Sequence, residues 1–484
     1  FFFFSASGQR TNTGSNTGSS LLSQFGKIGY SYSDLVLASV TLRRDGSSRF
    51  GSDTRYGIFP SATVGLRLNN FSFMDDVKSL SNLKVRAGYG EVGNQSIGDL
   101  AQFGLYEARY GPTMATYYGG FFEQYYNIGT AYDISGVNTG TLPSGFVSIQ
   151  AANPNLKWES TREINLGVDF GFLKNKIVGS FDYFTRTTDN ILIKPPIASA
   201  IGEGQQKWLN GATKENHGWE LSLGYQDETK GGLTYSVSTN FGASKDKITK
   251  LPEEVVAGYK GLPGNTILGH SQYEEFGYVA DGIFQDADEV AAWPTQIGAA
   301  PGRIKYKDLN GDKVVNSLDQ DWIGTYLPKL EYGLRVNLGY KSFDFSVFGS
   351  GVAGRKGVDA YIYYNNFVES RENAAPGTLD AWTASNKSSD IPAATIVDNN
   401  NEKRMSTYLL RNNSYFKLRS LQIGYNLPLD LVKKAGMSQL RVYFQGENMF
   451  WITPKGYIGS DPERTSIDRI PVPTSYSFGL SASF

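Results

Sequence analysis

The sequence contains no cysteine and only two histidines, His217 and His270. The lack of cysteine excludes a disulfide framework and a thiol nucleophile, and two histidines leave little for zinc or histidine-based catalysis. The sequence also has no surplus of charge of one sign. It contains 46 Lys and Arg and 47 Asp and Glu, which gives a net charge of −1. A nucleic-acid-binding protein would show a basic surplus. We therefore expect neither an enzyme nor a nucleic-acid partner.

No apolar run approaches the roughly 18–20 residues of a membrane helix. The mean hydropathy of −0.33 does not exclude a membrane barrel, because only alternate residues of its strands face lipid. The chain begins with four phenylalanines rather than Met and carries no signal peptide. We therefore expect that an N-terminal part is missing.

Alternation of apolar and polar residues is the main pattern that is present. In the last ten residues, Ser475–Phe484, Tyr476, Phe478, Leu480 and Phe484 share one parity, while serines and Gly479 share the other. A strand places these two sets on opposite faces. The same alternation recurs at 83–90, 164–172, 219–226, 331–340 and 421–427. This period of two predicts strands with one apolar face.

Connections between the predicted strands alternate in length. Short ones are expected at 32–34, 70–82, 174–176, 227–232, 340–342 and 428–439, and long ones at 93–157, 191–216, 249–330, 355–413 and 453–473. Outer-membrane barrels have short periplasmic turns and long external loops. We predict about thirteen antiparallel strands back to residue 24, with no separate soluble domain in residues 1–484. Bacterial barrels close with an even number of strands, so another segment should complete this one.

One stretch, Leu42-Arg-Arg-Asp-Gly-Ser-Ser-Arg-Phe-Gly51, concentrates arginine around a turn. Four arginines could pair with Asp45 and Asp53 in a network that fixes the loop at the rim, namely Arg43, Arg44, Arg49 and Arg55. Direct substrate contact by these arginines is the alternative. Ion pairs on a protein surface contribute only about 0–1 kcal/mol each to stability. We therefore expect these pairs to fix the conformation of the loop rather than to stabilise the fold.

The chain resembles the SusC/RagA-type TonB-dependent transporters of the Bacteroidetes. The resemblance rests on an ordered set of motifs that spans nearly the whole chain. They are the stretch 42–51, Gly93–Gly98, Asn153-Pro-Asn-Leu-Lys-Trp-Glu159, Asn216-His-Gly-Trp-Glu220, Asp281-Gly-Ile-Phe284, Tyr306–Asp312, Asn412-Asn-Ser-Tyr-Phe-Lys-Leu418 and Gly446-Glu-Asn-Met-Phe450.

The resemblance implies an all-β, 22-stranded transmembrane β-barrel of which this chain is the C-terminal portion, without the plug and first strands. It implies TonB-dependent import of a glycan or peptide oligomer across the outer membrane. The implied partners are a SusD-like lipoprotein, TonB with its inner-membrane energising proteins, and outer-membrane lipid, and a dimer of transporter–lipoprotein pairs is one arrangement. Phe484 resembles the terminal aromatic that is presented to the barrel-assembly machinery. Two alternatives stay open: a structural or adhesive barrel without transport, and a soluble all-β glycan-binding module.

A twelve-residue loop, 308–319, has oxygen ligands at calcium-loop spacing. Lys313 stands where such loops need glycine, and position twelve is Asp rather than Glu, so a polar loop of Asx turns is the alternative. The candidate ligands of a structural calcium are Asp308, Asn310, Asp312, the Val314 carbonyl, Asn316 and Asp319.

Aromatic residues in the long loops are candidates for stacking on sugar rings or for contact with a partner. Packing within the loops themselves is the alternative. The candidates are Tyr117, Tyr118, Tyr125, Tyr126, Trp208, Tyr361, Tyr363 and Tyr364.

Overall fold

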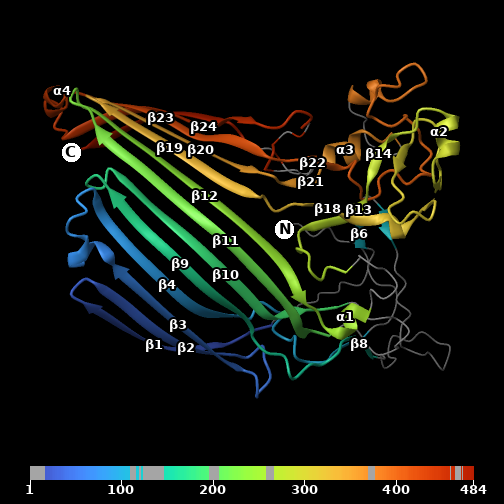
Figure 1. The fold of residues 1–484 in the computed structure, drawn as a ribbon, viewed down its shortest axis with the longest axis horizontal. Coiled ribbons are helices and arrows are strands. Elements are labelled where there is room, and N and C mark those ends of the chain that lie inside the picture. Colours follow the sequence, from blue (N-terminus) through green and yellow to red (C-terminus); the bar gives the residue numbers. More distant parts are fainter. Residues whose placement is uncertain are drawn as a thin grey trace, which may run out of the picture.

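A computed structural model describes residues 17–108, 116–118, 121–123, 146–195, 207–257, 266–368, 376–457, 459, 461–463, 470 and 472–484. Thirteen strands form one antiparallel sheet (Figure 1), as the alternation predicted. In order they are β1 (Leu21–Tyr32), β2 (Val36–Ser47), β3 (Tyr56–Arg67), β4 (Leu80–Asn94), β9 (Glu159–Phe172), β10 (Ile177–Ile193), β11 (Leu209–Glu228), β12 (Leu233–Lys250), β19 (Leu330–Tyr340), β20 (Phe343–Ala353), β23 (Tyr415–Asn426), β24 (Gln439–Ile452) and β25 (Ser475–Ser483). Within the described ranges, no helix is long and apolar enough to cross a membrane.

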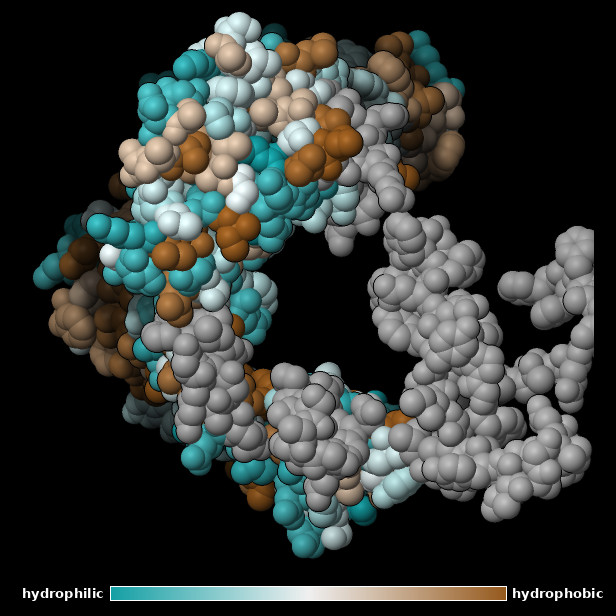
Figure 2. All heavy atoms as spheres, turned by 90° about the vertical axis from the view of Figure 1, so that its right-hand side faces the viewer, coloured by the Kyte–Doolittle hydropathy of each residue, from teal (hydrophilic) through white to brown (hydrophobic). Residues whose placement is uncertain are grey.

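The strand registers keep the apolar residues on one face. Val168 on β9 pairs with Val85 on β4 and Phe181 on β10, while the preceding residue, Gly167, pairs with Arg86 and Asp182. Figure 2 shows the sheet curving around a hollow interior, with hydrophobic side chains along the outer side of the arc. Because successive residues point to opposite faces, the polar rows face inward.

The exposed fractions of the side chains confirm that this sheet carries its apolar residues outside and its polar residues inside, the reverse of a water-soluble protein. The outward Ile164 and Leu166 are 53% and 54% exposed, whereas the side chain of the inward Asp182 is only 16% exposed. An apolar exterior around a polar interior is the arrangement of an outer-membrane barrel.

The two ends of the sheet differ in their connections, as predicted. At the left end in Figure 1 the strands are joined by residues 33–35, 68–79, 173–176, 229–232, 341–342 and 427–438. These short connections contain the single turns η1 (Leu68–Asn70), η2 (Ser72–Met74) and α4 (Leu429–Lys433). The other end carries the long connections 95–158, 194–208, 251–329, 354–414 and 453–474 and one short one, 48–55, and we call it the outer end. The first of these long connections contains β5 (Leu105–Ala108), β6 (Thr116–Tyr118), β7 (Phe121–Glu123) and β8 (Phe146–Gln150).

Two long connections pack together at the outer end, and we call residues 266–329 and 354–414 the outer unit. Its buried core consists of Ile304, Tyr306, Val315, Ile362, Phe367 and Leu409. A buried ion pair between Arg303 Nη1 and Glu402 Oε2 (3.0 Å) joins the two connections. The unit contains β13 (Glu274–Tyr278), β14 (Ala280–Ile283), α2 (Ala287–Ala292), β15 (Thr295–Gln296), β16 (Ile304–Tyr306), β17 (Val314–Val315), η4 (Ser317–Asp319), β18 (Gln320–Thr325), β21 (Lys356–Val358), α3 (Ala360–Asn365), η5 (Pro376–Asp380) and β22 (Leu410–Asn412), and α1 (Glu253–Ala257) precedes it.

A glycine on the inner face lets one ion cluster cross a whole strand. Arg86 on β4 donates to Asp169 on β9 (Nε–Oδ1 3.1 Å) and to Asp182 on β10 (Nη1–Oδ1 2.8 Å). Gly167 lies between Arg86 and Asp182 in the register, and a Cβ there would be 2.7 Å from Arg86 Cζ. The absence of a side chain therefore allows the guanidinium to reach the carboxylate beyond it.

A second cluster of this kind lies on the same inner face, nearer the β25 edge of the sheet. Arg441 on β24 donates to Asp344 on β20 (Nε–Oδ1 2.9 Å) across the intervening β23. A Cβ on Gly424 would lie 2.4 Å from Arg441 Nη2. Inward glycines thus tie together strands that do not pair directly.

We predict that Gly167→Val displaces the Arg86 guanidinium and leaves Asp182 without its cation. The expected cost is about 1–3 kcal/mol, because these groups are only partly exposed. Thermal unfolding of the detergent-solubilised protein measures this cost. Gly88→Val is the matched control on the same face, since its Cβ would meet nothing closer than 3.7 Å. Equal unfolding temperatures for the two variants would contradict the prediction.

Candidate functional site

Separate sequence motifs converge on one hydrophobic cluster at the outer end of β2, β3 and β4, which we call the mouth core. It consists of Phe50, Phe59, Ile97, Ala101, Leu156 and Trp158. Phe50 and Trp158 lie 5.1 Å apart between ring centroids, and Trp158 Nε1 donates to the Arg55 carbonyl (2.9 Å). Gly51 permits the close approach of Pro154, whose carbonyl oxygen would be 2.1 Å from a Cβ. The motifs at 42–51, 93–98 and 153–159 therefore stabilise the rim.

Among the residues that the structure describes, two of the four rim arginines form ion pairs, and one of the partners differs from the prediction. Arg43 pairs with Asp45 (Nε–Oδ2 2.7 Å), as expected. Arg49 pairs with Asp99 (Nε–Oδ1 2.8 Å) rather than with Asp53. Asp99 lies in the next long connection, so this pair holds two loops together.

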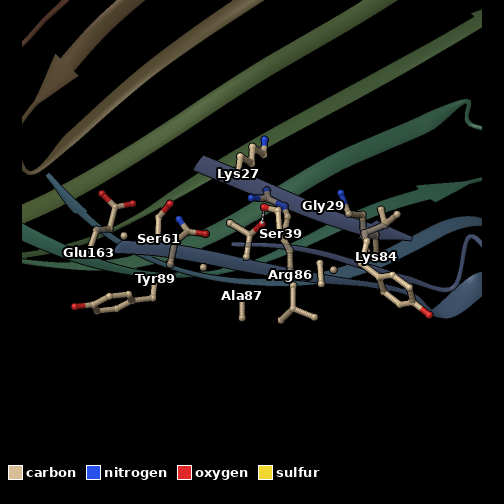
Figure 3. A pocket seen from close by; sticks show the side chains of 18 of the residues that line it. Lys27, Gly29, Ser39, Ser61, Lys84, Arg86, Ala87, Tyr89 and Glu163 are labelled. Atoms are coloured by element: carbon tan, nitrogen blue, oxygen red, sulfur yellow. Dashed lines mark hydrogen bonds between the residues drawn. The ribbon is translucent and has the colours of Figure 1, made fainter. Parts of the chain in front are cut away.

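A hollow of about 870 Å³ is bordered by residues of β1–β4 and β9 that come from both faces of the strands. Figure 3 shows Lys27, Ser61 and Glu163 on one side of the strands, with Ala87 and Tyr89 on the other. The hydroxyls of Ser39 and Thr63 lie 2.8 Å apart across neighbouring strands. Hydroxyl groups and paired charges suit a hydrophilic cargo, because they offer hydrogen bonds to replace those of water.

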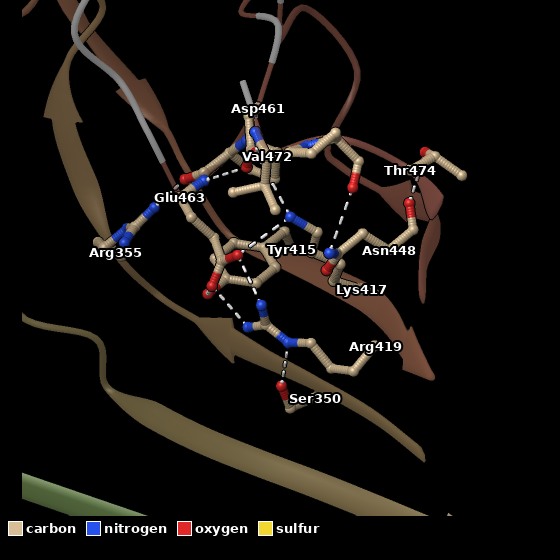
Figure 4. Close-up of polar contacts among 12 residues, drawn as sticks. Ser350, Arg355, Tyr415, Lys417, Arg419, Asn448, Asp461, Glu463, Val472 and Thr474 are labelled. Carbon is tan, nitrogen blue, oxygen red and sulfur yellow. Dashed lines mark hydrogen bonds and ion pairs between the residues drawn. The ribbon is translucent and has the colours of Figure 1, made fainter. Parts of the chain in front are cut away.

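At the outer end of β23, a cluster of four charged residues binds the last connection to the inner wall (Figure 4), and we call it the inner clamp. Lys417 and Asp461 are fully buried, with Lys417 Nζ 3.2 Å from Asp461 Oδ2 and 3.1 Å from Glu463 Oε2. Arg419 binds both oxygens of Glu463. Lys417 pairs in register with the inward Ser350, so Asp461 and Glu463 lie against the polar face.

A β-bulge helps to place the two cations of the inner clamp. The β20–β23 register shifts between Phe348 and Gly349, which pair with Ser420 and Leu418, so Arg419 is the extra residue, and its Nε donates to Ser350 Oγ (2.8 Å). The motif containing Lys417 was recognised in the sequence, but Asp461 and Glu463 were not. They lie more than forty positions away in a connection without periodicity.

The inner clamp lowers the pKa of Glu463 to about 2, chiefly through the hydrogen bonds from Arg419 and then those from Lys417. A carboxyl with a lowered pKa stabilises the folded state fully above its ordinary value of 4.5. Its contribution declines as the pH falls from about 4.5 to about 2 and is absent below that. The clamp is therefore fully formed at neutral pH.

The aromatic candidates lie in several places. Trp208 is half-buried and packs against the mouth core. Tyr361, Tyr363 and Tyr364 lie on α3, where Tyr363 also packs against the core of the outer unit. Tyr117 and Tyr118 belong to β6, although their side chains are outside the described residues, and so are Tyr125 and Tyr126 altogether. Contact with substrate or partner remains a prediction for this group.

The candidate calcium loop is held by hydrogen bonds to its own backbone. Asp308 accepts from the amides of Gly311 (2.7 Å) and Lys313 (2.8 Å). The fully buried Asp319 accepts from the amides of Leu309 (2.8 Å) and Asn316 (2.7 Å). The Asn310 and Asp312 side chains accept within the loop, and the Val314 carbonyl accepts from Asn316.

Lys313 has a φ of +66°, so it adopts the left-handed conformation that glycine usually supplies at this position. Across the described ranges, no group of three His, Cys, Asp or Glu side chains is arranged to hold a metal ion. The calcium site stays a prediction. Phe484 is 89% exposed beyond the end of β25, and its role in assembly likewise stays a prediction.

Comparison with known proteins places this architecture in a family. Residues 3–449 match the family model described as TonB dependent receptor-like, beta-barrel. The chain is 31% identical to TonB-dependent receptor SusC of Bacteroides thetaiotaomicron, covering 98% of this chain and 45% of that protein. It is 30% identical to TonB-dependent receptor P3 of Formosa agariphila, covering 92% and 42%. The chain thus spans less than half the length of these relatives.

The fold is also similar to a solved structure, that of the RagAB peptide transporter. The TM-score is 0.76 at 23% identity, and the match covers 96% of this chain and 48% of that chain. At this identity the likeness concerns the fold alone.

We predict that Glu463→Gln lowers stability at neutral pH by about 1–3 kcal/mol, because Lys417 and Arg419 lose charge-assisted hydrogen bonds. The difference from the parent protein should stay constant above pH 4.5 and vanish near pH 2. Thermal unfolding followed across pH measures it. Glu163→Gln, which removes an inner-wall carboxylate paired with Arg186, controls for general acid unfolding. A stability difference that persists unchanged at pH 2 would contradict the assignment.

Proposed function

The chain belongs to the family of TonB-dependent receptor β-barrels of the outer membrane, and we propose that it forms barrel wall in an active importer of a nutrient oligomer. The importer would work with a SusD-like surface lipoprotein and draw its energy through TonB. The observation that carries the proposal is the inverted sheet, whose lipid-facing exterior encloses a polar, hydroxyl-rich inner face.

The outer unit supports a paired arrangement. It is a folded body with its own buried core, built from two connections and lying beyond the outer ends of the strands, at the right in Figure 1. Rigid elements hold a binding surface more accurately than loops do, because fewer conformations must be ordered on binding. We propose that this unit and the mouth core form the platform on which the lipoprotein rests.

The cargo class is proposed from the inner face. Most of its charges are paired within the wall, including Arg86 with Asp169 and Asp182, and Arg441 with Asp344. Such a surface offers hydrogen bonds without a strong net field, which suits a glycan or a peptide. RagAB, which shares the fold, is described as a peptide transporter, whereas the name SusC specifies no cargo.

Two other functions are alternatives to import. A soluble glycan-binding module is disfavoured by the outward apolar rows, for example Phe478 and Leu480 at 84% and 73% exposure. A structural or adhesive barrel would share the wall. Dependence of uptake on the proton gradient separates it from an importer.

We predict that cells expressing the complete receptor accumulate labelled oligomer only while the proton gradient is intact, and that a surface lipoprotein co-purifies. Glu402→Gln should reduce both uptake and co-purification, because it leaves the buried Arg303 without its carboxylate and loosens the outer unit. Uptake of labelled glycan and peptide mixtures, measured with and without an uncoupler, tests this.

Lys307→Gln is the matched control, since Lys307 forms an exposed pair with Asp281 in the same unit. It should leave uptake unchanged. Accumulation that continues after the gradient is collapsed, or a receptor that purifies without any lipoprotein in mild detergent, would argue against the importer.

A further inference from the structure

A row of acids on the inner face spans a glycine, as the ion cluster of Arg86 does. Asp182 on β10, Glu220 on β11, Gly242 on β12 and Glu331 on β19 pair one after another across the four strands. Asp182 faces inward, so the whole row does. A Cβ on Gly242 would lie 3.9 Å from the Cγ of Glu220. The backbones of Glu220 and Glu331 are about 10 Å apart, twice the strand spacing, with no side chain of the row between them.

These two carboxylates have no cation of their own, unlike the other ion clusters of the inner wall. Within the described ranges, neither Glu220 nor Glu331 has an ion-pair partner. The nearby Arg186 is already engaged, because its Nε lies 2.5 Å from Glu163 Oε2 and its guanidinium lies 4.5 Å above the ring of Phe184. The charge that this part of the wall offers to a ligand is therefore negative.

A cavity of about 200 Å³ is bordered by both carboxylates. It lies where the pairing of β12 with β19 ends, at Gly242 and Glu331, and residues of both faces border it at this gap. Leu327 and Pro328, from the segment just before β19, add an apolar side. The volume corresponds to roughly seven water molecules at about 30 Å³ each. It therefore suits the end of one side chain rather than a sugar oligomer.

A third acceptor in the cavity is buried and unused. Asn216 lies in register with Arg186 on the inner face and lines the cavity. Its Oδ1 atom is buried, and in the part of the chain that the structure describes no donor reaches it. A buried acceptor without a donor is costly. Together with Glu220 and Glu331, it calls for a ligand that brings a positive charge and several N–H donors.

We propose that this cavity binds the guanidinium group of an arginine in a peptide cargo. The planar group has five N–H donors, enough to reach both carboxylates and the Asn216 oxygen, and its aliphatic stem lies against Leu327 and Pro328. Across the described residues no three His, Cys, Asp or Glu side chains are arranged to hold a metal ion, which favours an organic cation. The inference rests on the proposed import function and narrows its cargo to peptides with a basic residue.

The test compares two short fluorescent peptides that differ at one residue, arginine in one and its neutral isostere citrulline in the other. Fluorescence polarisation measures the Kd of each for the complete receptor in detergent. The arginine peptide should bind about tenfold more tightly, because charge-assisted hydrogen bonds are stronger than neutral ones. Glu220→Gln/Glu331→Gln should abolish this preference. Neither acid has a cation in the wall, so the substitutions leave no buried charge unpaired and the variant should unfold at the temperature of the parent.

Gly242→Val is a second, independent variant. It keeps both carboxylates and fills the space between them, so it should also reduce the preference for arginine. Glu447→Gln is the matched control, because Glu447 is an exposed inward carboxylate on β24 that accepts hydrogen bonds from Gln445 and Ser475 and lies outside the cavity. It should keep the full preference.

Several results would overturn this inference. The parent receptor could bind both peptides equally or bind neither, or the preference could persist unchanged in both variants of the cavity. Displacement of the arginine peptide by Ca²⁺ in the parent but not in Glu220→Gln/Glu331→Gln would assign the carboxylates to a metal instead. Uptake of glycan or of the citrulline peptide that depends on the proton gradient would still support import in each case, so the two proposals fail separately.

Discussion

The register between neighbouring strands is the constraint on which the rest of this structure depends. Side chains alternate with a period of two, so a slip of one residue would turn every apolar side chain of a strand inward. The pairing of Val85, Val168 and Phe181 on three successive strands shows that no such slip occurs. Because all thirteen strands keep the same parity, one face meets lipid and the other meets water. Backbone groups within the membrane are satisfied by the same pairing.

Departures from this register are concentrated where the membrane constraint ends. The β10–β11, β11–β12, β20–β23 and β23–β24 pairs are irregular toward the outer end. There the backbone meets water or packed loops, so an unpaired group can find another partner. One irregularity, in the β20–β23 pair, places Arg419 in the inner clamp. The inner clamp thus arises where the ladder of strand pairs is interrupted.

The regular part of the structure was predictable from sequence, because its signals are local. Alternation in 164–172 and 475–484, together with connection lengths, was enough to predict the strand number, the parity and the two kinds of end. The outer unit was expected only as long loops. Its core joins Ile304 and Tyr306 to Ile362 and Leu409, residues about fifty or more positions apart, and no periodicity connects them. The pairing of Lys417 with Asp461 was missed for the same reason, as was that of Arg49 with Asp99.

The position of the inner clamp follows from the energetics of buried charge. Lys417 is fully buried, and removal of its partners would leave an uncompensated charge at a cost of about 3–5 kcal/mol. Two carboxylates must therefore stay beside it, and the chain supplies both within three residues, Asp461 and Glu463. Such a cluster could not lie on the outward face, where lipid would raise its cost further. At the outer end of the inner face it ties the last connection to β23 and β20.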